Sequence, residues 1–229
     1  MSQPLHGDKA NTDSGERGSL ANLVYEHVSK LILSGELVSG DIIDRKRVAE
    51  DLNVSLAPVG EAVIRLVNEG FLEASARRHT MVRVVRKGDV RGQFVLRLAL
   101  ERQAVSMTHG EPVRRAKLEL LKLAEEVDRF PPKHPSAWSA EIAFHRLLVD
   151  LAECPALSNS HEQVMRRNYF FSINSAHVTI RKKEYSLAQH SKLVEGLCTD
   201  NAAEADRVIL DHYAEDWEAM LRPGSEDAL

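Results

Sequence analysis

The sequence predicts a mainly α-helical chain, in which an N-terminal winged helix-turn-helix is joined to an all-α bundle of six helices. Two observations carry this prediction. Residues 19–87 combine three short helical stretches with one strand-like segment that has a basic centre. From about Asp89 onward, apolar residues keep a helical spacing to near the end of the chain.

The first helix is expected to start at Ser19, a residue suited to capping, and to stop at Gly35. Apolar residues recur within it at helical spacing: Leu20, Leu23, Val24, Val28, Leu31 and Ile32. A second, short helix is expected at residues 45–54. Ser55 opens a third, which Gly70 ends.

The segment FLEASARRHTMVRVV, residues 71–85, has branched and alternating residues at both ends and a polar basic centre. This pattern predicts a two-stranded hairpin with Arg77, Arg78 and His79 at its tip. Helix, short helix, turn, helix and basic hairpin in this order are typical of a winged helix-turn-helix that binds double-stranded DNA.

The second half is expected to contain helices separated by helix-breaking residues. The breaks are the segment PPKHPS, the pair Cys154-Pro155 and the pair Asp200-Asn201, in which Asn201 is placed to cap the last helix. The expected helices lie near residues 89–109, 112–129, 136–153, 156–179, 184–199 and 201–221.

These elements divide the chain into two domains with polar ends. We expect residues 1–18 to form a disordered tail, 19–87 the DNA-binding domain, 88–223 the helical domain and 224–229 a second tail. The chain has 229 residues and is 43% hydrophobic, yet no run approaches the ~20 apolar residues of a membrane span. No membrane partner is therefore expected.

Charge and cysteine usage fit a cytoplasmic DNA-binding protein. Residues 17–91 hold 12 Lys and Arg against 10 Asp and Glu, whereas the chain as a whole has a net charge of -4. A mildly basic front half on an acidic body suits a nucleic-acid reader joined to a second module. Cys154 and Cys198 are far apart, which is typical of reduced structural thiols.

Four residues on three expected helices form a candidate metal site. Glu141 and His145 are four residues apart on one amphipathic helix, so their side chains share a face. His190 and His212 each occur among the apolar positions of their helices. Three imidazoles and one carboxylate that meet inside a bundle suit a divalent transition metal such as zinc or nickel. Spacing alone leaves open the alternative that each histidine is a hydrogen-bonded core residue.

Two parts of the sequence resemble a known family. VAEDLNVSLAPVGEAVIRLVNEGFLE resembles the winged helix-turn-helix of the GntR family of bacterial transcription regulators. AEIAFHRLLVDLAECPAL and SLAQHSKLVEGLCTDNAAEADRVILDHY are similar to the FCD effector domain of that family's FadR branch. The expected six helices fit the subgroup of the vanillate regulators better than the seven-helix subgroup.

The resemblance implies that Glu141, His145, His190 and His212 bind a metal, because an acid and three histidines fall in the family's order and approximate spacing. The metal would be zinc, with nickel or manganese as alternatives. Glu141 stands where the family usually has Asp. The longer side chain still reaches the metal, with a looser or bidentate geometry.

The resemblance also identifies a departure in the DNA-binding domain. Leu56 and Gly60 stand where the family typically has arginines one helical turn apart, and His79 replaces the usual glycine of the wing. Leucine offers only apolar contacts, for example to a thymine methyl group, so we expect retained DNA binding with altered specificity; the alternative is that binding has decayed. The candidate DNA-binding residues are Arg45, Lys46, Arg47, Ser55, Leu56, Ala57, Gly60, Arg65, Arg77, Arg78 and His79. Ordinary solvated surface is the alternative for the charged ones.

A small organic acid is the expected effector. Arg97 and Glu101 match a recurrent Arg and Glu of the first helix of the FCD domain, so Arg97 either binds an anionic effector or pairs with Glu101. Weaker candidates for effector binding are Arg166, Tyr169, Asn174 and His177. His161 is expected on an exposed face without a role.

The leading interpretation is a ligand-responsive bacterial transcription regulator, a repressor that binds its DNA operator as a homodimer and is not an enzyme. Its helical domain would hold the metal and a small carboxylate. Two alternatives remain at this point. One is a metal-dependent enzyme whose DNA-binding head is vestigial, and the other is a regulator in which the metal has a purely structural role.

Overall fold

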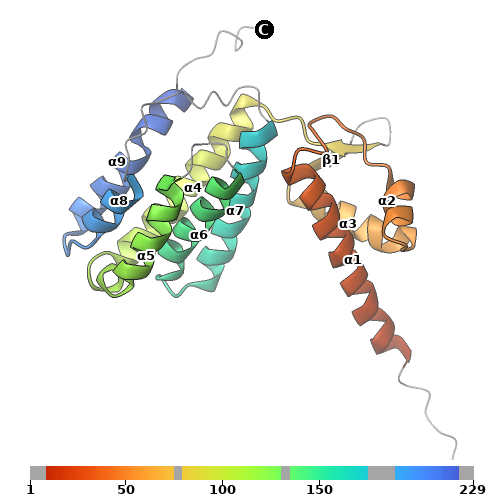
Figure 1. The fold of residues 1–229 in the computed structure, drawn as a ribbon, viewed down its shortest axis with the longest axis horizontal. Coiled ribbons are helices and arrows are strands. Elements are labelled where there is room, and N and C mark those ends of the chain that lie inside the picture. The colour runs from red at the N-terminus through yellow and green to blue at the C-terminus, as the bar shows by residue number, and fades with distance from the viewer. Residues whose placement is uncertain (1–8, 75–78, 130–134, 175–188, 222–229) are drawn as a thin grey trace, which may run out of the picture. The chain divides into compact units, whose positions relative to one another are not determined.

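The computed structural model describes residues 9–74, 79–129, 135–174 and 189–221 (Figure 1). The chain separates into two compact units, Met1–Val85 and Arg86–Leu229. The first unit contains helices and a small hairpin, and the second contains only helices within the described ranges. The predicted mainly α chain, with a helix-turn-helix ahead of a helical domain, is confirmed.

The N-terminal unit begins with three helices: α1 (Lys9–Leu33), α2 (Arg45–Asp51) and α3 (Leu56–Asn68). Helix α1 starts well before Ser19, so residues 9–18, expected as part of a disordered tail, continue the helix. Extending an existing helix adds one backbone hydrogen bond for each residue fixed, which makes it cheaper than starting one. The amphipathic pattern that marks residues 19–33 reports packing, and it therefore misses a helical extension.

Helices α1 and α3 form the core of this unit. Helix α1 packs against α3, and α3 packs against β1; the buried apolar residues of this unit include Val24, Val28, Ile32, Val59, Ala62, Val63, Leu66, Phe71, Leu72 and Val82. Asp44 caps α2, because its Oδ1 accepts hydrogen bonds from the backbone N–H groups of Lys46 and Arg47 at 3.0 and 3.1 Å. Gly70, with φ of 81°, ends the turn after α3 as expected.

The expected hairpin is present and antiparallel. Strands β1 (Leu72–Ala74) and β2 (Thr80–Val82) pair with Leu72 opposite Val82. Ile42 adds an isolated bridge to Met81, which ties the turn before α2 to the hairpin. The helix-turn-helix and its wing therefore share one small core.

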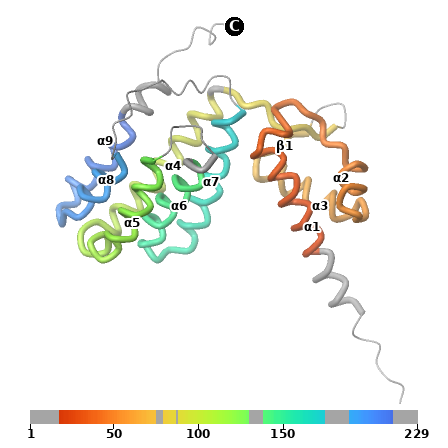
Figure 2. Tube along the Cα trace, in the orientation of Figure 1, coloured from red at the N-terminus to blue at the C-terminus, as the bar shows by residue number. Residues whose placement is uncertain are grey.

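The C-terminal unit contains six helices within its described residues, as the sequence predicted. They are α4 (Lys87–Thr108), α5 (Glu111–Arg129), α6 (Pro135–Asp150), α7 (Pro155–Asn174), α8 (Gln189–Leu197) and α9 (Ala202–Leu221). Helix α4 packs against both α7 and α9, and α5 packs against α6 and α8, as the trace in Figure 2 allows the reader to follow. The side chain of Asn201 caps α9 by accepting hydrogen bonds from the N–H groups of Ala203 and Glu204.

The core of this unit draws on α4, α5, α6, α8 and α9. Its buried residues include Phe94, Leu120, Phe144, Leu148, Leu193, Leu197, Ile209 and Tyr213. Helices α8 and α9 approach closely at Gly196, where an added Cβ would lie 2.7 Å from a methyl group of Val208. Within the described ranges, no helix is long and apolar enough to cross a bilayer.

Candidate functional site

Three of the four predicted metal ligands meet inside the C-terminal unit. Helix α6 supplies His145, α8 supplies His190 and α9 supplies His212. One nitrogen from each imidazole lies within 4.8 Å of the other two. His145 and His190 are buried, and His212 is half-buried. Residues far apart in the sequence are therefore brought within the space that one metal ion would need.

Glu141 lies one turn before His145 and faces the same space. Its Oε2 is 3.1 Å from Nε2 of His190, and its Oε1 is 3.4 Å from Nε2 of His145. Oε1 also accepts a hydrogen bond of 2.8 Å from Nη2 of Arg97. Burial would raise the pKa of Glu141, but His145, Arg97 and His190 outweigh it and hold this pKa well below its ordinary value. The carboxylate is thus ionised beside the histidines.

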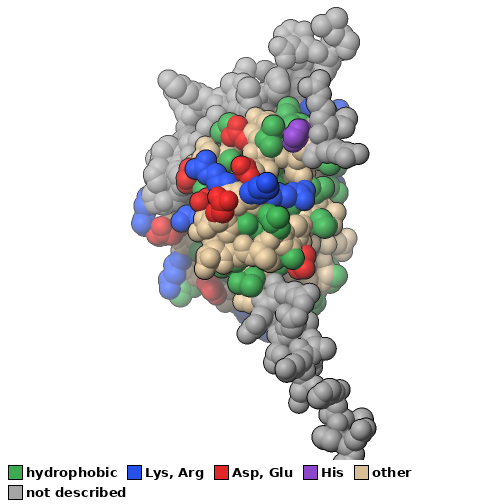
Figure 3. Space-filling model, turned by 90° about the vertical axis from the view of Figure 1, so that its right-hand side faces the viewer, with side chains coloured by type: hydrophobic (Ala, Val, Ile, Leu, Met, Phe, Trp, Pro, Cys, Tyr) green, Lys and Arg blue, Asp and Glu red, His purple; other side chains and the backbone are tan. Residues whose placement is uncertain are grey.

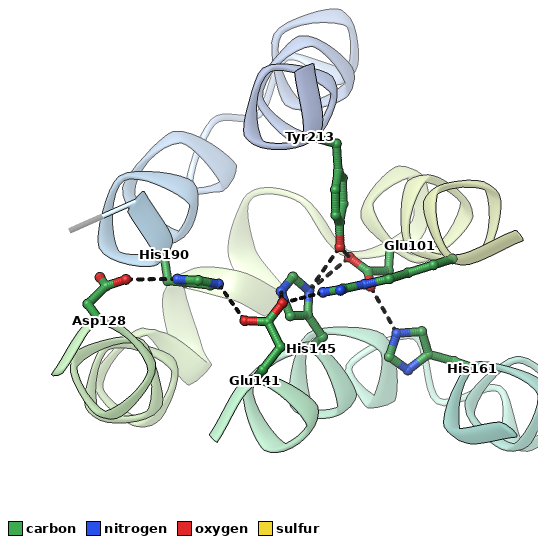
Figure 4. Close-up of polar contacts among 8 residues, drawn as sticks. Glu101, Asp128, Glu141, His145, His161, His190 and Tyr213 are labelled. Atoms are coloured by element: carbon green, nitrogen blue, oxygen red, sulfur yellow. Dashed lines mark hydrogen bonds and ion pairs between the residues drawn. The ribbon is translucent and has the colours of Figure 1, made fainter. Parts of the chain in front are cut away.

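Two further carboxylates orient the imidazoles from the outside (Figure 4). Oε2 of Glu101 on α4 lies 2.8 Å from Nδ1 of His145, and Oδ1 of Asp128 on α5 lies 2.8 Å from Nδ1 of His190. A carboxylate at Nδ1 fixes the proton there and turns the lone pair of Nε2 toward the space between the helices. Sequence analysis named Glu101 only as a partner of Arg97 and missed Asp128, because nothing near Asp128 in the sequence marks its distant partner.

The inward nitrogens are the strongest indication that a metal fits. Nε2 of His145 and Nε2 of His190 are buried, and neither has a hydrogen-bond partner of good geometry. Buried polar atoms without partners are rare in folded proteins, and leaving one costs about 1–3 kcal/mol. Two such nitrogens, a third imidazole and an ionised carboxylate form a donor set suited to a divalent transition metal.

The protonation of the histidines differs with their surroundings. Burial alone would lower the pKa of His190, but the charges of Glu141 and Asp128 reverse this and raise it to about 9. Burial lowers the pKa of His212 to about 3, helped by the nearby His145 and His190. Without metal, His190 is therefore doubly protonated and positively charged at neutral pH, whereas His212 is neutral and keeps a lone pair on one ring nitrogen.

Glu101 is the centre of a buried network. Its Oε1 accepts from Nε of Arg97 at 2.9 Å and lies 3.0 Å from Nε2 of His161, and its Oε2 accepts from the Tyr213 hydroxyl at 2.6 Å. Burial would raise the pKa of Glu101, but His145 and Arg97 hold it well below its ordinary value. The pairing of Arg97 with Glu101 is therefore observed, and Arg97 also reaches Glu141 across the site.

The expectation that His161 lies on an exposed face is wrong. His161 is fully buried on α7 and contacts Glu101, which precedes it by 60 residues. Its neighbours in SNSHEQ are polar, so local hydrophobicity gave no sign of burial. A buried imidazole needs a hydrogen-bond partner, and here that partner comes from another helix.

The remaining predicted effector residues lie on α7 or beyond it. Arg166, Tyr169 and Asn174 are half-buried. The ring of Tyr169 packs against Trp138 of α6, with centroids 5.2 Å apart. Asn174 donates a hydrogen bond to the carbonyl of Phe170 within its own helix. His177 lies outside the described residues, and Arg97 contacts the histidine cluster through Glu141.

The predicted phosphate-binding residues of α2 lie on the surface. Arg45, Lys46 and Arg47 are exposed at the first turn of this helix. Nη2 of Arg45 donates to the Thr80 hydroxyl at 2.9 Å, which steadies it beside the hairpin. Arg47 lies 3.9 Å from Asp51, but both side chains are largely exposed, so that pair holds Arg47 only weakly.

The predicted DNA-binding residues at and after the start of α3 lie at or near the surface, but Arg65 differs from the rest in its contacts. Ser55, Leu56 and Ala57 are exposed, and Gly60 is half-buried. Arg65 instead makes contacts within the unit: Nε donates to Oε1 of Glu69, Nη1 donates to Oδ1 of Asn22, and the guanidinium lies 3.6 Å from the centre of the Tyr25 ring. These contacts favour a structural role for Arg65.

The wing is described only in part. Arg77 and Arg78 lie outside the described residues, and His79 is exposed just before β2. The antiparallel pairing of β1 with β2 on either side of this segment is the part of the predicted hairpin that the structure describes.

Comparison with known proteins decides the family. The profile of bacterial regulatory proteins of the gntR family matches residues 20–82, and that of the FCD domain matches residues 93–215. The FCD match alone spans more than half of the chain. The chain belongs to the GntR family of transcription regulators. It carries the FCD effector domain that the sequence analysis expected.

Individual GntR relatives agree with this assignment. The HTH-type transcriptional repressor RspR of Escherichia coli K12 is 24% identical over 213 residues, which cover 90% of each chain. An HTH-type transcriptional regulator of Mycobacterium tuberculosis is 36% identical over 59 residues, or 26% of this chain and 24% of that protein. The relatives are transcription regulators, so the expectation of a protein that is not an enzyme is confirmed, and the enzyme alternative is not supported.

Solved structures share the fold. A GntR transcriptional regulator from Rhodococcus sp. RHA1 matches with a TM-score of 0.68 and 22% identity, over 88% of this chain and 96% of that one. McbR/YncC of E. coli matches with a TM-score of 0.67 and 20% identity over the same shares. Within this GntR fold, the exposed Leu56 and the half-buried Gly60 lie in the first two turns of α3, at the two positions where the resemblance leads one to expect arginines.

Proposed function

We propose that this GntR regulator is a repressor that binds its DNA operator as a homodimer and is controlled by a small organic acid and a divalent metal in its FCD domain. The observation that carries the proposal is the convergence of His145, His190 and His212, with the buried Nε2 atoms of His145 and His190 turned toward one space beside Glu141. The same chain also carries the DNA-binding helix-turn-helix of the gntR family. As a bacterial regulator of DNA, the protein would act in the cytoplasm.

The metal would be held by Glu141 and the three histidines. Zinc fits a set of imidazoles and one carboxylate best, and nickel or manganese are alternatives. When bound, the metal would supply a positive charge and coordination positions for an anionic ligand. The outer carboxylates of Glu101 and Asp128 would hold the His145 and His190 rings in place.

A small carboxylate would approach the same space. Arg97 lies against it, buried, with its guanidinium shared between Glu101 and Glu141. Its forked donors suit a carboxylate, so an acid that binds here would compete with Glu141 for Arg97. Arg166, Tyr169, Asn174 and His177 are proposed as further effector contacts from α7 and the segment after it.

The proposed DNA-binding role rests on the N-terminal unit, and the proposed repressor role rests on similarity to a known repressor. The exposed Arg45, Lys46 and Arg47 beside α3 suit phosphate contacts, and a two-fold dimer would place two heads on two half-sites. RspR, similar along most of the chain, is named a repressor, which supports repression.

Metal content tests the first half of the proposal. His190→Ala and His212→Ala proteins should lose bound metal after mild chelation and reloading, because each removes one ligand. His109→Ala is the matched control, since His109 lies in the same unit and bonds to the carbonyl of Thr199 outside the cluster. Wild-type metal content in both His190→Ala and His212→Ala would contradict the proposed site.

DNA binding tests the second half. Full-length protein should enrich particular duplexes from a random library, and its affinity for them should change when metal and candidate organic acids are added together. Equal binding to selected and scrambled duplexes at low salt would contradict a regulator. Binding that ignores metal and acids alike would leave the metal a purely structural role.

A further inference from the structure

Helix α3 presents an apolar stripe to solvent. Leu56, Gly60 and Ile64 follow each other at four-residue intervals and share one face of the helix, with Ala57 beside them. Leu56 is 54% and Ile64 is 62% exposed. A side chain added at Gly60 would meet no atom within 4 Å. These four residues are called the apolar stripe below.

The stripe is not needed for the core of its own unit. The opposite face of α3 is filled by Val59, Ala62, Val63 and Leu66, all buried. An isoleucine and a leucine on the outer face therefore gain nothing from the fold and expose apolar surface to water. A ligand that covers this face would remove that cost.

The outer face of α3 offers no free cationic donor that could bond to guanine. Its charged residues are Glu61 and Arg65. Glu61 is exposed, and a carboxylate accepts hydrogen bonds, whereas guanine presents acceptors in the major groove. The guanidinium of Arg65 is engaged by Glu69 and Asn22. These contacts favour a structural role for Arg65, so the outer face of α3 meets a duplex mainly with apolar side chains.

Basic side chains accompany the stripe. Arg45, Lys46 and Arg47 are exposed at the start of α2, which packs against α3. Figure 3 shows hydrophobic, basic and acidic side chains side by side on the face that it presents. Positive charge next to an apolar surface is complementary to a duplex, whose phosphates are negative and whose major groove carries apolar methyl groups.

We propose that the apolar stripe reads thymine C5-methyl groups in the major groove, so that thymines opposite α3 define each half-site of the operator. The inference rests on the proposed function and names the chemistry of its DNA-binding surface. Leu56 and Ala57 lie at the helix start, where a recognition helix contacts base edges, and Ile64 extends the contact by two turns. Gly60 leaves room for the groove wall to approach.

Removal of the methyl group tests this directly. Full-length protein first selects duplexes from a random library, and the thymines of the selected site are then replaced by deoxyuridine, which lacks only the C5-methyl group. Affinity should fall roughly fourfold for each methyl group that the stripe covers, the value of about one buried methyl group. Substitution of 5-methylcytosine at unrelated positions should have no such effect.

Protein variants show which side chains are responsible. Leu56→Ala and Ile64→Ala should bind the thymine duplex more weakly and lose most of their sensitivity to deoxyuridine. Leu23→Ala, a leucine on α1 with a similar exposure of 49%, should keep both affinity and sensitivity. Gly60→Arg should add a preference for guanine, because the new side chain has open space.

The outcomes separate the inference from the function on which it rests. Selected sites that bind equally well with deoxyuridine, or that centre on guanines contacted by α3, would overturn the inference while leaving a DNA-binding regulator. Failure to select any duplex would overturn the proposed function itself, and the stripe would then be a surface for another protein.

Discussion

Metal affinity of the helical unit should rise about tenfold for each pH unit between 7 and 9. A histidine must be neutral to bind metal, so a metal ion has to displace the proton that His190 carries. With the ordinary histidine pKa of about 6.5, this rise would end below neutral pH. Glu141 and Asp128 instead raise the pKa of His190 to about 9 despite its burial.

The size of the effect follows from this pKa. The pH of 7 is two units below the pKa of His190. Removing the proton from this histidine therefore costs metal binding about 2.7 kcal/mol, or roughly 100-fold in affinity. His212, with a pKa of about 3, is neutral over this range and adds nothing. The pH dependence between 7 and 9 should therefore follow one group.

Calorimetric titration with zinc measures both the affinity for zinc and the number of protons released. A competing chelator keeps the concentration of free zinc low. In two buffers with different ionisation enthalpies, His190 should contribute about one released proton per metal at pH 7 and none well above pH 9. Asp128→Asn should move the curve to lower pH, because one of the two carboxylates that raise the pKa of His190 is neutralised. His109→Ala should leave it unchanged. An affinity that levels off near pH 6.5, with no proton released by His190 at pH 7, would refute the reasoning.

Four further outcomes are expected. In metal-free protein the raised pKa of His190 stabilises the fold by up to about 3.4 kcal/mol below pH 6.5, and urea unfolding should show this stability being lost as pH rises through 9. Arg77→Ala with Arg78→Ala should weaken binding to all duplexes and flatten its salt dependence by about one unit of slope for each phosphate that the protein no longer binds. Light scattering should give twice the mass of one chain, and a monomer at micromolar concentration would contradict the proposed dimer. Gly196→Ala should cost about 1–3 kcal/mol in thermal unfolding because α8 and α9 touch there, whereas Gly92→Ala on α4, with open space, should stabilise.

Much of the fold could be predicted from the sequence because local signals marked it. Helical spacing located the helices of the second unit, Asn201 marked the start of α9, and Gly70 marked the end of α3. The start of α1 could not be placed, because its first residues extend a helix without an apolar pattern. Helix geometry could likewise place Glu141 beside His145, which lies on the same helix.

The outer part of the site could not be predicted, because its contacts join residues that are distant in the sequence. Asp128 precedes His190 by 62 positions and Glu101 precedes His161 by 60, so no spacing rule connects them. The polar surroundings of His161 even suggested an exposed residue. Which residue becomes the hydrogen-bond partner depends on how the helices pack against one another, and the sequence of a single helix does not determine that packing.

The carboxylate of Glu101 has consequences for how this domain can change over generations. Its two oxygens serve Arg97, His145, His161 and Tyr213, which fills the acceptor positions that a carboxylate offers. Replacing any one partner leaves the other three beside an altered charge, so substitutions should be strongly non-additive, by about 0.5–3 kcal/mol per pair. A substitution at one of these five positions therefore favours further substitutions at the others, so we expect the five side chains to change together during evolution.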